Sequence, residues 1–249
     1  MQLITDYASI EQLNVLLDVE KAYPFSIVDG YQSGEVFVDD INDPTVALFW
    51  HRSGFAFIAG ECNRDFLAEI HDMMLNPTPE HCNRMIVQTR DLSLFNDYED
   101  VTRYKRYTFS LKKEAPELVI PEGCELRPIT TEVFGKLDAK VRPADYWKDA
   151  EEFASKGFGY YLSKGDEILA FAFSAAVSNK RVDIGVDTFE KYREHGYGKV
   201  VASAMLRETL NQKKTPVWAC IEENEASQSL ACSIGFDIFE LHPYYKIQK

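Results

Sequence analysis

The sequence predicts an α+β protein whose second part is a mixed, mostly antiparallel sheet flanked by helices. Short apolar stretches between residues 158 and 188 are separated by Gly165-Asp166 and Asn179-Lys180, which are typical hairpin turns. A strand at 181–188 leads into a glycine-rich turn, and apolar residues then recur at helical spacing as far as Leu210. Strands joined in these two ways form one sheet with helices against it.

A domain boundary is predicted within residues 112–123, which are charged and contain two prolines. We therefore expect an N-terminal α/β domain at 1–113 and a second domain at 117–249. At 249 residues, with 45% hydrophobic residues, the chain is long and apolar enough to build two cores.

The first domain is expected to alternate helices and strands. Helices are predicted at 9–22, with Ser9 as the N-cap and Pro24 ending it, and at 63–76, with Asn63 as the N-cap. Strands are predicted at 35–38, 45–50, 55–59, 85–89 and 103–111. His71, His81 and Cys82 match no zinc-site spacing, so we interpret them as packed or solvated side chains.

The second domain is expected to contain more strands and helices than the first. Strands are expected at 124–129, 158–163, 168–178, 181–188, 217–221 and 236–245, and helices at 131–141, 144–156, after the glycine-rich turn to 210, and from Asn224 to 233.

Composition limits the classes of function. A net charge of −13 disfavours nucleic acids and anionic membranes as partners and favours a cationic or amine substrate. The cysteines are odd in number and form no C-x-x-C motif, which indicates free thiols in a reducing compartment. No signal peptide or membrane-spanning stretch is visible, so we expect a cytoplasmic protein.

The segment Arg193-Glu194-His195-Gly196-Tyr197-Gly198-Lys199 has the character of an anion-binding site. It opens a helix, where backbone N–H groups are unpaired and the helix dipole is positive. Arg193, His195 and Lys199 add side-chain donors, so we expect this segment to bind phosphate.

This segment has three other possible interpretations. A P-loop needs Lys followed by Ser or Thr and an earlier glycine, but Val200 follows Lys199 and residue 193 is arginine. A dinucleotide fingerprint needs a third glycine, where Val201 stands, and a turn directly after the strand. A glycine-rich loop without a ligand remains an alternative.

The motif from Arg193 to Gly198 resembles the R/Q-x-x-G-x-G/A signature of the GCN5-related N-acetyltransferases (GNAT). The resemblance to the family covers residues 184–236. Within the family, the chain is most similar to a mostly bacterial branch of two-part chains. This likeness covers roughly the C-terminal half and extends less closely to 29–60. Its further motifs are Val186-Asp187-Thr188, Pro216-Val217-Trp218, Asn224-x-x-Ser227, Leu230-Ala231 and Gly235-Phe236. The first domain then resembles a degenerate second copy, which would wall the acceptor cleft or mediate a homodimer contact.

The resemblance implies the acyl-CoA N-acyltransferase fold and acetyl-CoA as co-substrate, without a metal. The strand before the motif would splay from the strand after it, leaving a gap for the pantetheine arm. The cofactor-binding residues implied are Val186, Thr188, Arg193, Glu194, His195, Gly196, Tyr197, Gly198, Lys199, Asn224 and Ser227.

The expected reaction needs a base, because an amine must lose a proton to attack. We expect it among Asp183, Asp187 and Glu223, with Glu222 beside them, although each could equally be a solvated carboxylate. Where many family members carry a tyrosine that protonates the leaving thiolate, this chain has Ala231, followed by Cys232. Other hydroxyls that could serve are Tyr192, Tyr197, Tyr244 and Tyr245.

Together these features predict an N-acetyltransferase that transfers the acetyl group to a small-molecule or protein amine by direct attack in a ternary complex. The alternative is a CoA-binding regulatory module of the same fold without turnover, because Ala231 replaces the tyrosine.

Overall fold

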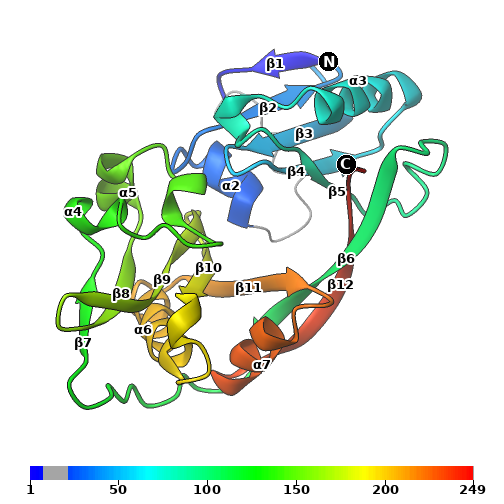
Figure 1. The fold of residues 1–249 in the computed structure, drawn as a ribbon. Coiled ribbons are helices and arrows are strands. Elements are labelled where there is room, and N and C mark those ends of the chain that lie inside the picture. Colours follow the sequence, from blue (N-terminus) through cyan, green and yellow to red (C-terminus); the bar gives the residue numbers. More distant parts are fainter. Residues whose placement is uncertain (8–21, 249) are drawn as a thin grey trace. The chain divides into compact units, whose positions relative to one another are not determined.

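The computed structural model describes residues 1–7 and 22–248, and these form two compact units (Figure 1). The first unit comprises Met1–Arg106 with Leu241–Lys249, and the second comprises Tyr107–Glu240. The division therefore falls inside two strands, β6 (Val101–Leu111) and β12 (Phe236–Ile247), whereas the sequence predicts it in the charged segment 112–123. Most of the helix predicted at 9–22 lies outside the described residues.

The first unit is built on a sheet with strand order β1-β2-β3-β4-β5-β12. Its elements are β1 (Gln2–Ile4), α2 (Ala22–Val28), β2 (Gly34–Val38), β3 (Val46–His51), β4 (Phe55–Gly60), α3 (Arg64–Leu75) and β5 (Ile86–Gln88). Strands β1 to β4 are antiparallel neighbours, and β4 and β5 are parallel because α3 connects them. The predicted strands of this unit are thus present.

Helix α3 shows why these residues fold as predicted. Phe66, Ile70 and Met74 recur at helical spacing and are buried against the sheet. The Asn63 side chain caps the helix by accepting a hydrogen bond of 2.9 Å from the amide of Phe66. Pro24 is itself helical, as a residue of α2, whereas the helix that it was predicted to end lies mostly outside the described residues.

The second unit has the strand order β6-β11-β10-β9-β8-β7. Its elements are β7 (Glu125–Pro128), α4 (Thr131–Phe134), α5 (Ala150–Lys156), β8 (Gly159–Lys164), β9 (Glu167–Val177), β10 (Arg181–Thr188), α6 (Tyr197–Asn211), β11 (Thr215–Ile221) and α7 (Glu225–Ser233). Strands β7 to β10 are antiparallel neighbours, and β11 is parallel to β10. The mixed, mostly antiparallel sheet flanked by helices is therefore confirmed.

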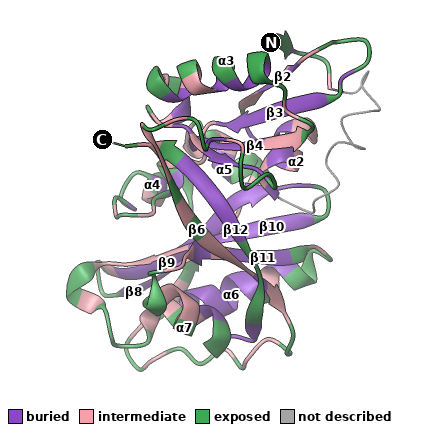
Figure 2. Cartoon of the chain, turned by 90° about the vertical axis from the view of Figure 1, so that its right-hand side faces the viewer, coloured by how far each residue is buried: buried purple, intermediate pink, exposed green. Residues whose placement is uncertain are grey.

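Helices cover both faces of this sheet. On one face, Val201, Met205 and Leu206 of α6 are buried against apolar residues such as Ile184 and Trp218. Figure 2 shows that much of α6 is buried. The other face carries a cluster of buried aromatic rings from α4, α5, β9 and the segment between the two helices: Phe134, Trp147, Phe153, Phe171 and Phe173.

The helices predicted at 131–141 and 144–156 are both too long. Helix α4 ends at Phe134, next to Gly135, and α5 begins only after Asp149, whose side chain accepts from the amide of Glu152. Pro143 holds Arg142 in an extended conformation (φ −124°, ψ 145°), which no helix can continue through. Residues 135–149, which we call the α4–α5 loop, consequently lie across the aromatic face of the sheet.

Two buried tryptophans allow the anchoring of this loop to be tested. Nε1 of Trp147 donates a hydrogen bond of 2.8 Å to the carbonyl of Ser174, whereas Nε1 of Trp50 is buried with no acceptor among the described residues. We predict that Trp147→Phe lowers the free energy of unfolding by about 1–3 kcal/mol more than Trp50→Phe does, because only the first leaves a buried carbonyl unpaired. Urea denaturation followed by circular dichroism measures both; equal losses would contradict the role given to the hydrogen bond.

Candidate functional site

The centre of the candidate site is a gap between β10 and β11. Their parallel register pairs Arg181 with Thr215 and ends at Asp183 paired with Val217. The remaining residues of β10 stay paired with β9 as far as Thr188. The carboxyl-terminal halves of β10 and β11 therefore diverge, as the sequence resemblance led us to expect, and we call the gap after Asp183 the fork.

A bulge in β9 lies at the point where the fork opens. Asp183 pairs with Ala176 and Ile184 with Ser174, so Ala175 is an extra residue on β9. A bulge increases the local twist of a strand pair, which turns the end of β10 away from β11.

The segment predicted to bind phosphate stands at the end of β10, and we call Arg193–Lys199 the cradle. Gly196 is the N-cap of α6 with φ +79°, and no side chain caps the helix. The first turn of α6 contains no acid. The amide of Lys199 bonds to the carbonyl of Gly196 at 3.1 Å, while the amides from His195 to Gly198 have no acceptor in the described part of the chain. Several N–H groups at a positive helix end are therefore available to an anion.

The cradle is held close to the end of β10. Nε of Arg193 donates to the carbonyl of Thr188 at 3.2 Å. At Gly198, a Cβ atom would lie only 3.0 Å from Oγ1 of Thr188, so the absence of a side chain lets α6 approach the strand. Glu194 adopts φ +66°, a left-handed conformation unusual for a residue other than glycine. The side chains of His195 and Lys199 are exposed, as an ionic contact with a soluble ligand requires.

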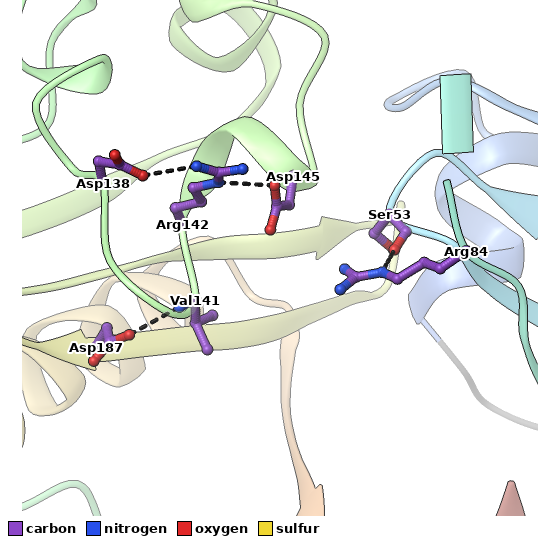
Figure 3. Close-up of polar contacts among 7 residues, drawn as sticks. All are labelled: Ser53, Arg84, Asp138, Val141, Arg142, Asp145 and Asp187. Atoms are coloured by element: carbon purple, nitrogen blue, oxygen red, sulfur yellow. Dashed lines mark hydrogen bonds and ion pairs between the residues drawn. The ribbon is translucent and has the colours of Figure 1, made fainter. Parts of the chain in front are cut away.

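The two aspartates of β10 differ in their surroundings. Asp183 is only 9% exposed and stands at the last paired position, where the fork opens. Asp187 is already engaged: its Oδ2 accepts from the amide of Val141 at 2.8 Å (Figure 3), and its Oδ1 accepts from the amide of Thr188 at 2.8 Å. Strand alternation places both aspartates on the face of the sheet that the α4–α5 loop covers.

The end of β11 brings a tyrosine that the sequence did not indicate. The hydroxyl of Tyr107, on β6, donates to Oε1 of Glu222 at 3.4 Å. Burial and the adjacent Glu222 carboxylate raise the pKa of Tyr107. The two residues are 115 positions apart, and only the pairing of β6 beside β11 brings them together. The neighbouring Glu223 is exposed.

The predicted residues of α7 have structural partners. Oδ1 of Asn224 caps the helix by accepting from the amide of Ser227 at 3.1 Å, as predicted from the sequence. Oγ of Ser227 accepts from Nε1 of Trp218 at 3.2 Å. Ala231 is fully buried in the core under α6, and Cys232 is exposed. Of the other tyrosines, Tyr197 is half-buried in the first turn of α6, whereas Tyr244 and Tyr245 belong to the first unit.

Two histidines of the first unit, His71 and His81, are paired with an acid or a carbonyl. Nε2 of His71 lies 2.9 Å from Asp100, and His81 lies between Glu35 at 3.0 Å and the carbonyl of His51 at 3.1 Å.

Among the residues described, no group of three His, Cys, Asp or Glu side chains could hold a metal ion. No helix within those residues is long and apolar enough to cross a membrane.

The first unit repeats the strand–helix–strand arrangement without its chemistry. Strands β4 and β5 are parallel over three residue pairs, like β10 and β11, and Phe57 occupies the third paired position where β10 has Asp183. The N-terminus of α3 is closed by the Asn63 side chain and has Asp65 in its first turn. The Asn63 side chain already binds an amide that an anion would need, and the carboxylate of Asp65 would repel an anion. This helix end is therefore not a second cradle.

Comparison with known proteins gives these features a context. The model of the GNAT acetyltransferase family matches residues 14–245. A protein of Bacillus subtilis (strain 168), named as an uncharacterized N-acetyltransferase, is 26% identical over 241 residues, which is 90% of this chain and 89% of that protein.

Two solved structures share the fold over nearly the whole chain. The GCN5-related N-acetyltransferase-like protein from Streptococcus suis 89/1591 superposes with a TM-score of 0.77, at 22% identity, over 98% of both chains. A tandem GNAT protein from the clavulanic acid biosynthesis pathway superposes with a TM-score of 0.62, at 11% identity, over 98% of both chains.

The left-handed conformation of Gly196 can be tested by substitution. A Cβ at this position would meet no atom within 4 Å, so backbone strain is the only cost. We predict that Gly196→Ala lowers the free energy of unfolding by about 1 kcal/mol and Gly196→Asn by less, because asparagine tolerates positive φ. Chemical denaturation measures both, and a larger loss for the asparagine variant would refute the explanation.

Proposed function

This chain belongs to the GNAT acetyltransferase family, and on that premise we propose that it transfers an acetyl group from acetyl-CoA to an amine. The observation that carries the proposal is the uncapped N-terminus of α6, which stands directly beside the fork between β10 and β11. An anion site next to a gap between strands suits a cofactor with a pyrophosphate and a long polar arm.

We propose that the amides from His195 to Gly198 bind the pyrophosphate of CoA. The side chain of Lys199 adds positive charge and that of His195 adds a hydrogen-bond donor, whereas the amide of Lys199 is used within the helical turn. The pantetheine arm carries amide groups, which can pair with the unpaired edge of β10 in the fork as an added strand does. Bound in this way, acetyl-CoA supplies an activated thioester acetyl group.

Among the predicted carboxylates, we propose Asp183 as the base that takes the proton of the amine, directly or through water. It stands where the fork opens, and its burial holds the carboxylate, which accepts the proton, in a defined position. Asp187 is a weaker candidate because both of its oxygens already accept backbone hydrogen bonds. The exposed Glu223 is a third.

The oxyanion of the tetrahedral intermediate needs a hydrogen-bond donor at the fork. The amide of Thr188 already donates to Asp187, so we propose the amide of Val186 for this task. Ala231 offers no hydroxyl to the leaving thiolate. A thiol with a pKa of about 8.5 can leave as the thiolate at neutral pH without a strong acid.

The acceptor is proposed as an amine of a small molecule or of a protein, because the chain carries a net charge of −13. We also propose a cytoplasmic location, because the cysteines are free thiols. A homodimer remains a prediction from the sequence. A second candidate function is a CoA-binding regulatory module without turnover, which the buried Ala231 favours.

We predict that isothermal titration with CoA gives one binding site per chain. Lys199→Glu should weaken binding about 10-fold or more by placing a negative charge in the cradle. Lys148→Glu, the same charge change at an exposed lysine of the α4–α5 loop, is the matched control and should leave the affinity within about 2-fold. No binding to the unmodified protein would refute both candidate functions, and two sites per chain would refute the assignment to the second unit alone.

Turnover separates the two candidate functions. Thiol release from acetyl-CoA over a panel of amines should be detectable, and with an amine that is accepted, Asp183→Asn should lower kcat about 10²–10³-fold while CoA affinity stays within about 2-fold. Glu223→Gln tests the third candidate in the same way and should retain most activity, because Asp183 is the proposed base. Binding without turnover for every amine would favour the regulatory module, and a full rate in Asp183→Asn would exclude Asp183 as the base.

A further inference from the structure

The α4–α5 loop is attached to the catalytic sheet at separate points. The ring of Tyr146 packs edge-on against Phe173, with 5.5 Å between the ring centroids, and Trp147 is bonded to the carbonyl of Ser174. Before these residues, the amide of Val141 donates to Asp187 on β10. Two of these points, Phe173 and Ser174, lie on β9, and only Asp187 stands beside the cradle.

The part of the loop nearest Asp187 is braced internally. The guanidinium of Arg142 binds Asp138 at 2.7 Å and Asp145 at 2.9 Å (Figure 3). These two carboxylates raise the pKa of Arg142 and keep it charged. Residues 138–145 are therefore joined through one side chain, and an attachment at Val141 fixes the position of all of them.

The other side of Asp187 faces the cradle. Its Oδ1 accepts from the amide of Thr188 and lies 3.8 Å from Nη2 of Arg193. Arg193 in turn donates to the carbonyl of Thr188. The carboxylate of Asp187, whose side chain is 10% exposed, thus connects the α4–α5 loop to Arg193, the first residue of the cradle.

We propose that Asp187 is a positioning residue that couples the cradle to the α4–α5 loop, so that binding of the acetyl donor at the cradle orders this loop over the face of the sheet that carries Asp183, the proposed base. The inference rests on the proposed function for the identity of the donor. The chemistry of the side chain carries the link: a carboxylate offers two acceptor oxygens, one to Val141 and one to Thr188, and asparagine offers only one. By thermodynamic reciprocity, a loop released from Asp187 must also weaken donor binding.

Amide hydrogen exchange at Val141 tests the link without an acceptor substrate. In the free full-length protein, Asp187→Asn should reduce protection of this amide about 10-fold, because a hydrogen bond to a charged group is lost. Arg193→Gln should reduce it about 3-fold, because an exposed ion pair contributes less. Asp138→Asn is the matched control, since Asp138 belongs to the same loop and, within the described part of the chain, bonds to Arg142 and not to β10; it should leave Val141 protection unchanged within about 2-fold.

The second measurement adds CoA. In the unmodified protein, saturating CoA should raise protection of the Val141 amide about 5-fold or more, and in Asp187→Asn this increase should be absent. Unchanged protection in both Asp187→Asn and Arg193→Gln would overturn the proposal. If CoA fails to bind at all, the proposed function fails, while the comparison of the free variants still decides whether Asp187 links the two elements.

Kinetics distinguish positioning from acid–base catalysis. With an accepted amine, Asp187→Asn should raise the KM for the amine and keep the ascending limb of the pH profile of kcat. Loss of that limb would show instead that Asp187 is the base, and would overturn the positioning role.

Discussion

The parallel register between β10 and β11 ends after three residues, and the candidate site depends on this short register. A fully paired strand has no free edge, so a longer register would close the space between the two strands. The bulge at Ala175 of β9 gives β10 the extra twist with which it leaves its neighbour. The same divergence places the end of β10 next to the start of α6, where glycine replaces a capping side chain.

The two units show that strand topology alone does not make such a site. Each has antiparallel strands followed by a helix and a parallel strand, with three paired residues at the crossover. In the first unit, Asn63 satisfies an amide at the start of α3, and Phe57 stands where β10 has Asp183. A single side chain at a helix start decides whether the free N–H groups serve the fold or remain for a ligand.

Asp187 illustrates how a residue of the right type can have a different role. From alternation along the strand, Asp183 and Asp187 are equivalent, since both point to one face. The amide that claims Asp187 belongs to Val141, in a segment that we expected to be helical and that Pro143 keeps extended. The carboxylate consequently acts as an acceptor for the backbone, and the proposal of Asp183 as the base rests on its buried position where the fork opens.

Local chemistry explains what the sequence by itself determined. Periodicity identified most strands and the helices α3, α6 and α7, and the glycine spacing at 193–198 predicted a helix start with unpaired N–H groups, because helix starts and tight turns depend on neighbouring residues. Asn63 and Asn224 were recognisable as caps for the same reason. The contact of Tyr107 with Glu222, the hold of Asp187 on Val141 and the division of the chain inside β6 and β12 were decided only by tertiary structure. Each depends on which strands and loops become neighbours, and pairing between segments that are distant in sequence leaves no periodic signal along the chain.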